Sequence, residues 1–82
     1  MIQEQSNTPI GKVAALAKWN DLLCDEAALL AAPGTHHKAL LDQAHYLHKT
    51  HVIDGDDLSD LLEQADGALA YAIESLIDHL GE

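Results

Sequence analysis

The stretch that decides the fold is DLSDLLEQADGALAYAIESLIDHL, residues 57–80. Apolar side chains recur in it at alternating steps of four and three residues. This spacing keeps them on one side of an α-helix, which turns once in about 3.6 residues. We expect that side to form the seam of a core or of a dimer, together with apolar residues of an earlier helix. The predicted seam comprises Leu58, Leu62, Ala65, Leu69, Ala72, Leu76, Leu80, Trp19 and Leu23.

The size of the chain predicts one domain with a thin core. It has 82 residues, with no phenylalanine, one tryptophan and two tyrosines. A domain of this size buries only about 60% of the surface that its unfolded chain exposes. The core must therefore come from Leu, Ala, Ile and Val, which favours closely packed helices. Cys24 is the single cysteine, so no internal disulfide can form, as is usual in a reducing compartment.

The chain before residue 57 predicts two further helices. Residues 1–8 lack an apolar period, so we expect a disordered N-terminal tail there and a single helical domain over residues 9–82. Thr8 as N-cap and Pro9 at the first helical position are expected to start a helix. That helix should continue until Pro33-Gly34 ends it.

The middle helix is expected over about residues 36–51, with Thr35 as its N-cap. A turn at Ile53–Asp56 should follow, and Asp56 or Asp57 should cap the last helix. Three helices joined by short loops run up, down and up. The predicted fold class is therefore all-α, as a small antiparallel three-helix bundle or an extended helical hairpin.

The lengths of these helices predict a homodimer. The middle helix is the shortest, and in a hairpin it should end opposite roughly Ala72 of the last helix. The apolar residues beyond that point must then meet the first helix or a second copy of the chain. We therefore expect dimerisation through the first and last helices. The residues in question are Ile73, Leu76, Ile77 and Leu80.

The charge of the chain excludes some partners. Four lysines and no arginine stand against 14 acidic residues, which gives a net charge of −10. Nucleic-acid binding draws its affinity from Lys and Arg side chains on phosphates, so we expect no nucleic acid as a partner. The same field repels anionic membranes and attracts basic proteins. No apolar run approaches the ~18 residues of a membrane span, so we expect a cytoplasmic protein with no membrane contact.

The acidic residues of the last helix are the candidate partner-binding surface. A run of charge is usually a solvated face, but here no lysine is interleaved with the acids. Asp56 and Asp60 are four residues apart, where like charges destabilise a helix by a few tenths of a kcal/mol. Because the sequence keeps such a pair at a cost in stability, we expect this face to bind a basic protein. The candidate residues are Asp56, Asp57, Asp60, Glu63 and Asp66.

Six histidines allow three interpretations. They can be ordinary residues at the edge of the core, each with a hydrogen-bond partner. Alternatively, His45, His48 and His51, which are spaced three residues apart, are candidates for a metal site that needs further ligands. The third interpretation is a pH switch in which protonated imidazoles loosen a helix interface. On a helical wheel, His37 joins His48 and His51 on the apolar arc, whereas His36 and His45 fall outside it.

These patterns predict a small acidic protein that is not an enzyme. No nucleophile–base pair, phosphate-binding glycine loop or cofactor motif is present, so we expect no catalytic residue and no cofactor. We expect a protein-interaction or regulatory module that binds a basic partner through its acidic last helix. An accessory role in a bacterial or mobile-element system fits such a module. The alternative is a histidine-based protein that binds metal or senses pH.

Overall fold

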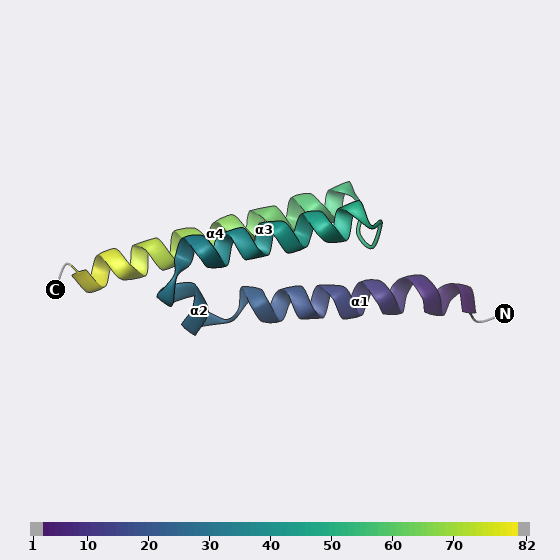
Figure 1. The fold of residues 1–82 in the computed structure, drawn as a ribbon, viewed down its shortest axis with the longest axis horizontal. Helices are drawn as coiled ribbons and strands as arrows, with labels where there is room; N and C mark the ends of the chain where they lie inside the picture. The colour runs from purple at the N-terminus through teal and green to yellow at the C-terminus, as the bar shows by residue number, and fades with distance from the viewer. Residues whose placement is uncertain (1–2, 81–82) are drawn as a thin grey trace.

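The computed structural model of the protein describes residues 3–80. These residues form four helices and no strand: α1 (Gln3–Leu23), α2 (Glu26–Ala31), α3 (Pro33–Lys49) and α4 (Gly55–Leu80). Figure 1 shows α3 and α4 as an antiparallel hairpin, with α1 lying along it in the direction of α4. The short α2 turns the chain between α1 and α3. The predicted all-α class is confirmed, in an elongated molecule of 61 × 19 × 15 Å.

The first helix begins earlier than expected. α1 starts at Gln3, so the part of the predicted tail that the structure describes is helical and Pro9 lies inside the helix. Gln and Glu, which dominate the first turn, are good helix formers, and this propensity favours an early start. Residues 1–2 of the predicted tail lie outside the described residues. The assignment of residues 9–82 to a single domain stays a prediction.

One expected helix is divided into two, because Asp25 starts a new helix. α1 ends at Leu23, and a carboxylate oxygen of Asp25 accepts the backbone N–H of Ala28 at 3.2 Å. A side-chain oxygen in this position satisfies an N–H group that the new helix leaves unpaired. The described residues therefore form four helices where three were predicted.

Pro33 begins α3, whereas we predicted that it would end the preceding helix. The preceding residue, Ala32, has φ −150° and ψ 78° and is the cap of both α2 and α3. A residue before proline is disfavoured in the α region, which stops α2 at this point. Proline is tolerated at the first position of the next helix because that N–H would be unpaired anyway. Thr35, the predicted N-cap, lies within α3.

A Schellman motif ends α3 and places the α3–α4 turn over residues 50–54, earlier than predicted. Val52 donates its backbone N–H to the Leu47 carbonyl at 2.9 Å, and His51 donates its own to the His48 carbonyl at 3.0 Å. In this motif the residue directly after the C-cap has a left-handed backbone conformation. His51 holds that position and has φ 66°. A histidine therefore stands where glycine is usually found.

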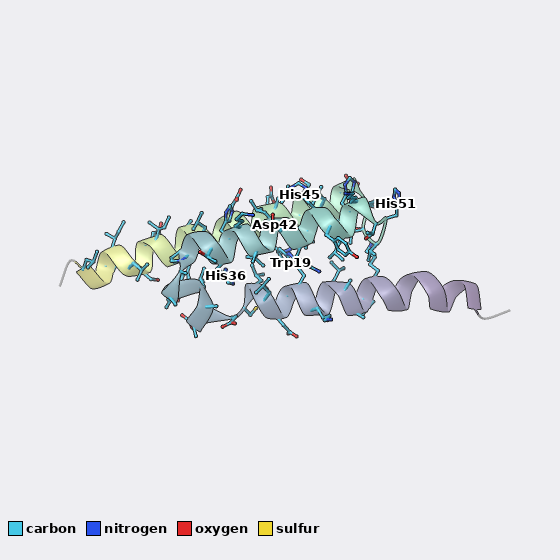
Figure 2. All side chains as sticks on the ribbon, in the orientation of Figure 1. Trp19, His36, Asp42, His45 and His51 are labelled. Carbon is cyan, nitrogen blue, oxygen red and sulfur yellow. The ribbon has the colours of Figure 1, made fainter. Side chains whose placement is uncertain are left out.

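The core lies where α1 meets the α3–α4 hairpin. Trp19 is 2% exposed, and its Nε1 donates to the Leu40 carbonyl of α3 at 3.0 Å. Figure 2 shows this side chain between α1 and the hairpin. The buried cluster around the indole ring draws on all three long helices and on the turn. Its other members are Leu40, Ala44, Leu47, Ile53, Leu61 and Ala65.

The predicted seam divides into a covered part and an exposed part. Ala65 and Ala72 are buried, and Leu58, Leu62 and Leu69 are half-buried, as is Leu23 of α1. Leu76 and Leu80, by contrast, are 36% and 83% exposed. α4 is longer than α3, and Figure 1 shows its C-terminal turns running beyond the start of α3. The seam therefore lacks cover from α3 beyond about residue 72.

We predict that replacing His51 with glycine stabilises the protein. Glycine adopts a positive φ without the steric cost that a side chain carries, and a strained residue of this kind costs about 1 kcal/mol or more. The His51→Gly variant should melt about 4–8 °C higher than the wild type, measured by circular dichroism. The control is His51→Ala, which loses the same imidazole but keeps the strain and should show no gain. Equal melting temperatures for His51→Gly and the wild type would contradict the prediction.

Candidate functional site

The start of α4, where the candidate acidic surface begins, is held by two aspartates that cap each other. The backbone N–H of Asp57 donates to Oδ1 of Asp54 at 2.8 Å, and that of Asp54 donates to Oδ2 of Asp57 at 3.3 Å. This is a capping box with aspartate in place of the usual glutamate or glutamine. The N-cap is therefore Asp54, which corrects the predicted assignment to Asp56 or Asp57. The signal in the sequence is the three-residue spacing of the two aspartates.

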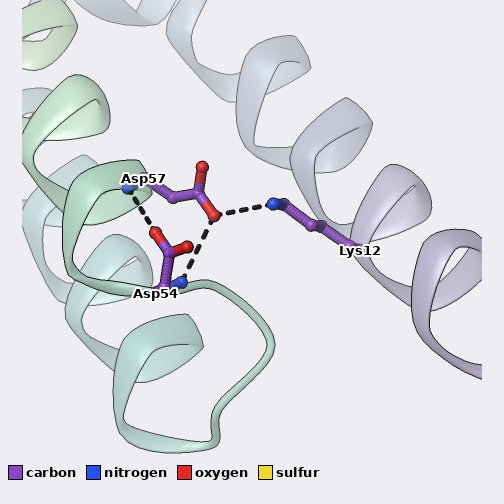
Figure 3. Close-up of polar contacts among 3 residues, drawn as sticks. All are labelled: Lys12, Asp54 and Asp57. Atoms are coloured by element: carbon purple, nitrogen blue, oxygen red, sulfur yellow. Dashed lines mark hydrogen bonds and ion pairs between the residues drawn. The ribbon is translucent and has the colours of Figure 1, made fainter.

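Lys12 joins α1 to this capping box. Its Nζ lies 2.7 Å from Oδ2 of Asp57, as Figure 3 shows. The hydrogen bond from Lys12 lowers the pKa of Asp57, and the backbone N–H of Asp54 lowers it further. The same bond to Asp57 raises the pKa of Lys12. Asp57 therefore has a cation as its partner inside the chain, a role that the sequence analysis did not assign to Lys12.

A second candidate acid also has an internal partner. Oδ1 of Asp66 on α4 lies 2.9 Å from Nε2 of His37 on α3. The His37 side chain is 20% exposed, whereas the Asp66 side chain is 73% exposed. Because the carboxylate is mostly in water, this contact positions Asp66 without removing it from the surface.

The other three candidate acids are exposed. Asp56, Asp60 and Glu63 lie on the first turns of α4. Among the side chains that the structure describes, no lysine or histidine forms an ion pair with them. The five candidates thus divide into two groups: Asp57 and Asp66, on opposite sides of α4, bind within the chain, and the three carboxylates between them face solvent. We call the five residues together the acidic face.

The C-terminal half of α4 carries a polar contact to α2. The Tyr71 hydroxyl donates to Oε2 of Glu26 at 2.8 Å. Beside this bond lies an open hollow of about 340 Å³, lined by apolar side chains that include Leu29 and by Cys24. Glu74 and Asp78, the last two acids of α4, are exposed. The negative charge of α4 therefore extends beyond the acidic face to the far end of the helix.

The three histidines that are candidates for a metal site are exposed and do not form a ligand cluster. His45, His48 and His51 lie on the outer side of α3 and on the turn, and Figure 2 shows His45 and His51 directed away from α1. His48 and His51 line an open hollow of about 430 Å³ together with Lys12. Within the described part of the chain, no three His, Cys, Asp or Glu side chains are placed to hold one metal ion. The apolar-arc placement of His48 and His51 was wrong.

His36 is buried, although the helical wheel placed it outside the apolar arc. It is 4% exposed, and its Nε2 lies 2.6 Å from the Leu22 carbonyl at the end of α1. A carbonyl can only accept, so Nε2 carries the ring proton. Nδ1 is buried without a hydrogen-bond partner among the described residues. The prediction failed because α3 contacts α4 on one side and α1 and α2 on another, whereas the wheel allowed for one buried side.

Comparison with known proteins assigns no family. The chain matches no family model, no curated protein and no solved structure. Within residues 3–80, no helix is long and apolar enough to cross a membrane. Inference about function therefore rests on the surface itself.

We predict that the Lys12–Asp57 pair loses its effect on stability in acid. A carboxyl group whose pKa is lowered by folding stabilises the protein above its unfolded pKa, about 4 for aspartate, and stops doing so as the pH falls through the folded value. Lys12→Met should therefore lower the urea midpoint at neutral pH, and the difference from the wild type should shrink as the pH falls below about 4 and vanish once it is below the lowered pKa of Asp57. Urea titrations at several pH values measure this.

The control for this experiment is Lys38→Met. Lys38 pairs with Asp42 at 2.9 Å within one turn of α3, and both side chains are more than two-thirds exposed. Such a solvated pair contributes little, so this variant should stay close to the wild type throughout. A difference between Lys12→Met and the wild type that persists unchanged in acid would contradict the prediction.

Proposed function

We propose that the protein is a small, non-enzymatic interaction or regulatory module that binds a basic partner protein through the acidic face. The observation that carries the proposal is the charge of α4. This helix of 26 residues holds seven acidic side chains and no lysine or arginine. A surface of one sign steers oppositely charged partners and raises the rate of association.

The repulsion within the acidic face supports the same conclusion. Asp56 and Asp60 are exposed and four residues apart on α4, a spacing at which like charges repel. A basic partner would replace that repulsion by attraction. The stability of the free helix would gain from lysines at these positions, so their absence favours a role in binding. An accessory role in a bacterial or mobile-element system remains the setting that we propose.

Self-association belongs to the same proposal. Apolar side chains at the end of α4 are exposed, and in this elongated molecule that end of the helix is accessible to a second copy of the chain. We propose that the protein forms a homodimer in which the C-terminal turns of α4 gain the cover that α3 does not supply. The acidic face then remains available, because it lies on the first half of α4.

We predict that charge reversal on the acidic face weakens binding to a polycation. The double variant Asp60→Lys/Glu63→Lys should bind a fluorescent poly-lysine peptide about tenfold more weakly than the wild type, because four units of local charge are changed. Fluorescence anisotropy measures the affinity, and circular dichroism checks that the helices remain. The wild type and the double variant are also immobilised and exposed to an extract of the native cells. Mass spectrometry of the retained proteins then identifies the natural partner.

The control matches the change in net charge at another place. Asp21→Lys/Asp42→Lys, on the exposed surfaces of α1 and α3, also shifts the net charge from −10 to −6, because each reversal adds two units. This variant should retain most of the affinity. If both double variants lose affinity equally, only net charge matters and the acidic face is not the binding surface.

A second candidate function, pH sensing by a histidine, is favoured by the place of the buried His36 ring. Its Nε2–H donates to the Leu22 carbonyl, and Nδ1 is buried without a hydrogen-bond partner among the described residues. The ring therefore lies in the contact between α3 and the end of α1. The metal-binding alternative has no such support from a cluster of ligands within the described residues.

A further inference from the structure

The C-terminal turns of α4 carry an apolar surface that nothing in the described chain covers. Ile73, Leu76, Ile77 and Leu80 are 45%, 36%, 60% and 83% exposed. We call these four residues the terminal stripe. It continues directly from the buried Ala72, at the point where Figure 1 shows α4 leaving α3 behind. The stripe is therefore an uncovered extension of the core.

The terminal stripe is free of charge. Its members follow the spacing i, i+3, i+4 and i+7, which places them on one side of a helix that advances about 100° per residue. Glu74 lies about 110° from the centre of the stripe, at its edge beside Ile77, and Asp78 lies about 150° away, on the opposite side of α4. Because no acid lies within the stripe, its occupant is selected by apolar contact and not by positive charge. A basic helix has no advantage at this position over a second copy of the same chain.

The protein exposes more surface than a compact monomer of the same mass. The chain exposes 5591 Å², whereas a compact protein of 8.8 kDa exposes about 4,800 Å². The excess of about 800 Å² is spread over the whole elongated surface, and it is comparable with the share that one partner contributes to a standard protein–protein interface. The radius of gyration, 15.2 Å, also exceeds the roughly 12 Å expected for a compact chain of this length.

We infer that the terminal stripe binds the terminal stripe of a second copy, with the two α4 helices antiparallel about a two-fold axis. The inference deepens the proposed self-association and rests on it, but it does not depend on the proposed binding of a basic partner. The spacing of the stripe is symmetric about the midpoint between Leu76 and Ile77. An antiparallel copy therefore places Ile73 against Leu80 of the partner subunit and repeats the same contact on the other side of the axis.

The antiparallel arrangement also agrees with the shape of the molecule. The bulk of each copy, formed by α1, α2 and α3, lies toward the N-terminal end of the stripe, as Figure 1 shows. Antiparallel stripes put the two bodies at opposite ends, whereas parallel stripes would crowd them together. Since both copies use the same surface, the assembly closes as a dimer and does not grow into a filament. Glu74 and Asp78 remain on the outer sides of the paired helices.

Sedimentation equilibrium tests the surface. The wild type, studied from about 1 µM to about 1 mM, should approach twice the mass of the 8.8 kDa chain. Ile77→Lys should weaken dimerisation at least about 100-fold, because it buries an unpaired charge at the centre of the contact. The matched control is Val13→Lys, which adds the same charge at a residue of α1 that is 65% exposed, and it should dimerise as the wild type. Circular dichroism confirms that both variants fold.

Disulfide trapping tests the orientation. In a Cys24→Ser background, Ile73→Cys and Leu80→Cys chains are mixed and oxidised. Antiparallel stripes should give mainly the mixed disulfide between residues 73 and 80, whereas a majority of 73–73 and 80–80 disulfides would overturn the antiparallel arrangement. A wild type that stays monomeric throughout would overturn both the self-association and this inference. A dimer that Ile77→Lys leaves intact would overturn this inference alone, and the poly-lysine experiment remains independent of either result.

Discussion

The burial of Trp19 is the contact on which the rest of the structure depends. Its ring is 2% exposed, and Nε1 donates to the Leu40 carbonyl, so an apolar contact and a hydrogen bond together hold α1 against α3. Loss of a buried tryptophan side chain typically costs about 3–5 kcal/mol, out of about 5–15 kcal/mol for a whole domain. With α1 held there, Lys12 reaches Asp57 and the end of α1 presents the Leu22 carbonyl to His36. The start of α4 and the acidic face thus depend on a residue of a different helix.

The fold could be predicted from the sequence where one apolar period continues without interruption. That condition holds for α4, whose helix and buried side were both predicted, with Ala65 and Ala72 in the core. The prediction failed at boundaries that depend on single capping groups. Asp25 divides the first expected helix, and Pro33 starts a helix where it was expected to end one, because the same residue types favour starts and stops. Such local alternatives differ by about 1 kcal/mol, which tertiary packing decides.

The candidate site was predicted only in part, for a related reason. The acids of α4 are recognisable because no base interrupts them, and Asp60 and Glu63 are exposed as a binding surface requires. The pattern of residues along one helix does not show where the other helices lie. Lys12 reaches Asp57 from α1, and His36 is buried because α3 contacts neighbours on two sides. A helical wheel describes one helix, so it cannot tell which of its sides a third helix will cover.

The measurement that tests this account most directly is collisional quenching of the fluorescence of Trp19, the single tryptophan of the chain. Acrylamide is titrated into the native protein and into the same protein unfolded in urea. With the ring buried between α1 and the α3–α4 hairpin, the quenching constant of the native protein should be several-fold below that of the unfolded chain. Equal quenching in the two states would show that α1 does not pack against the hairpin, and the arrangement built on that contact would be wrong.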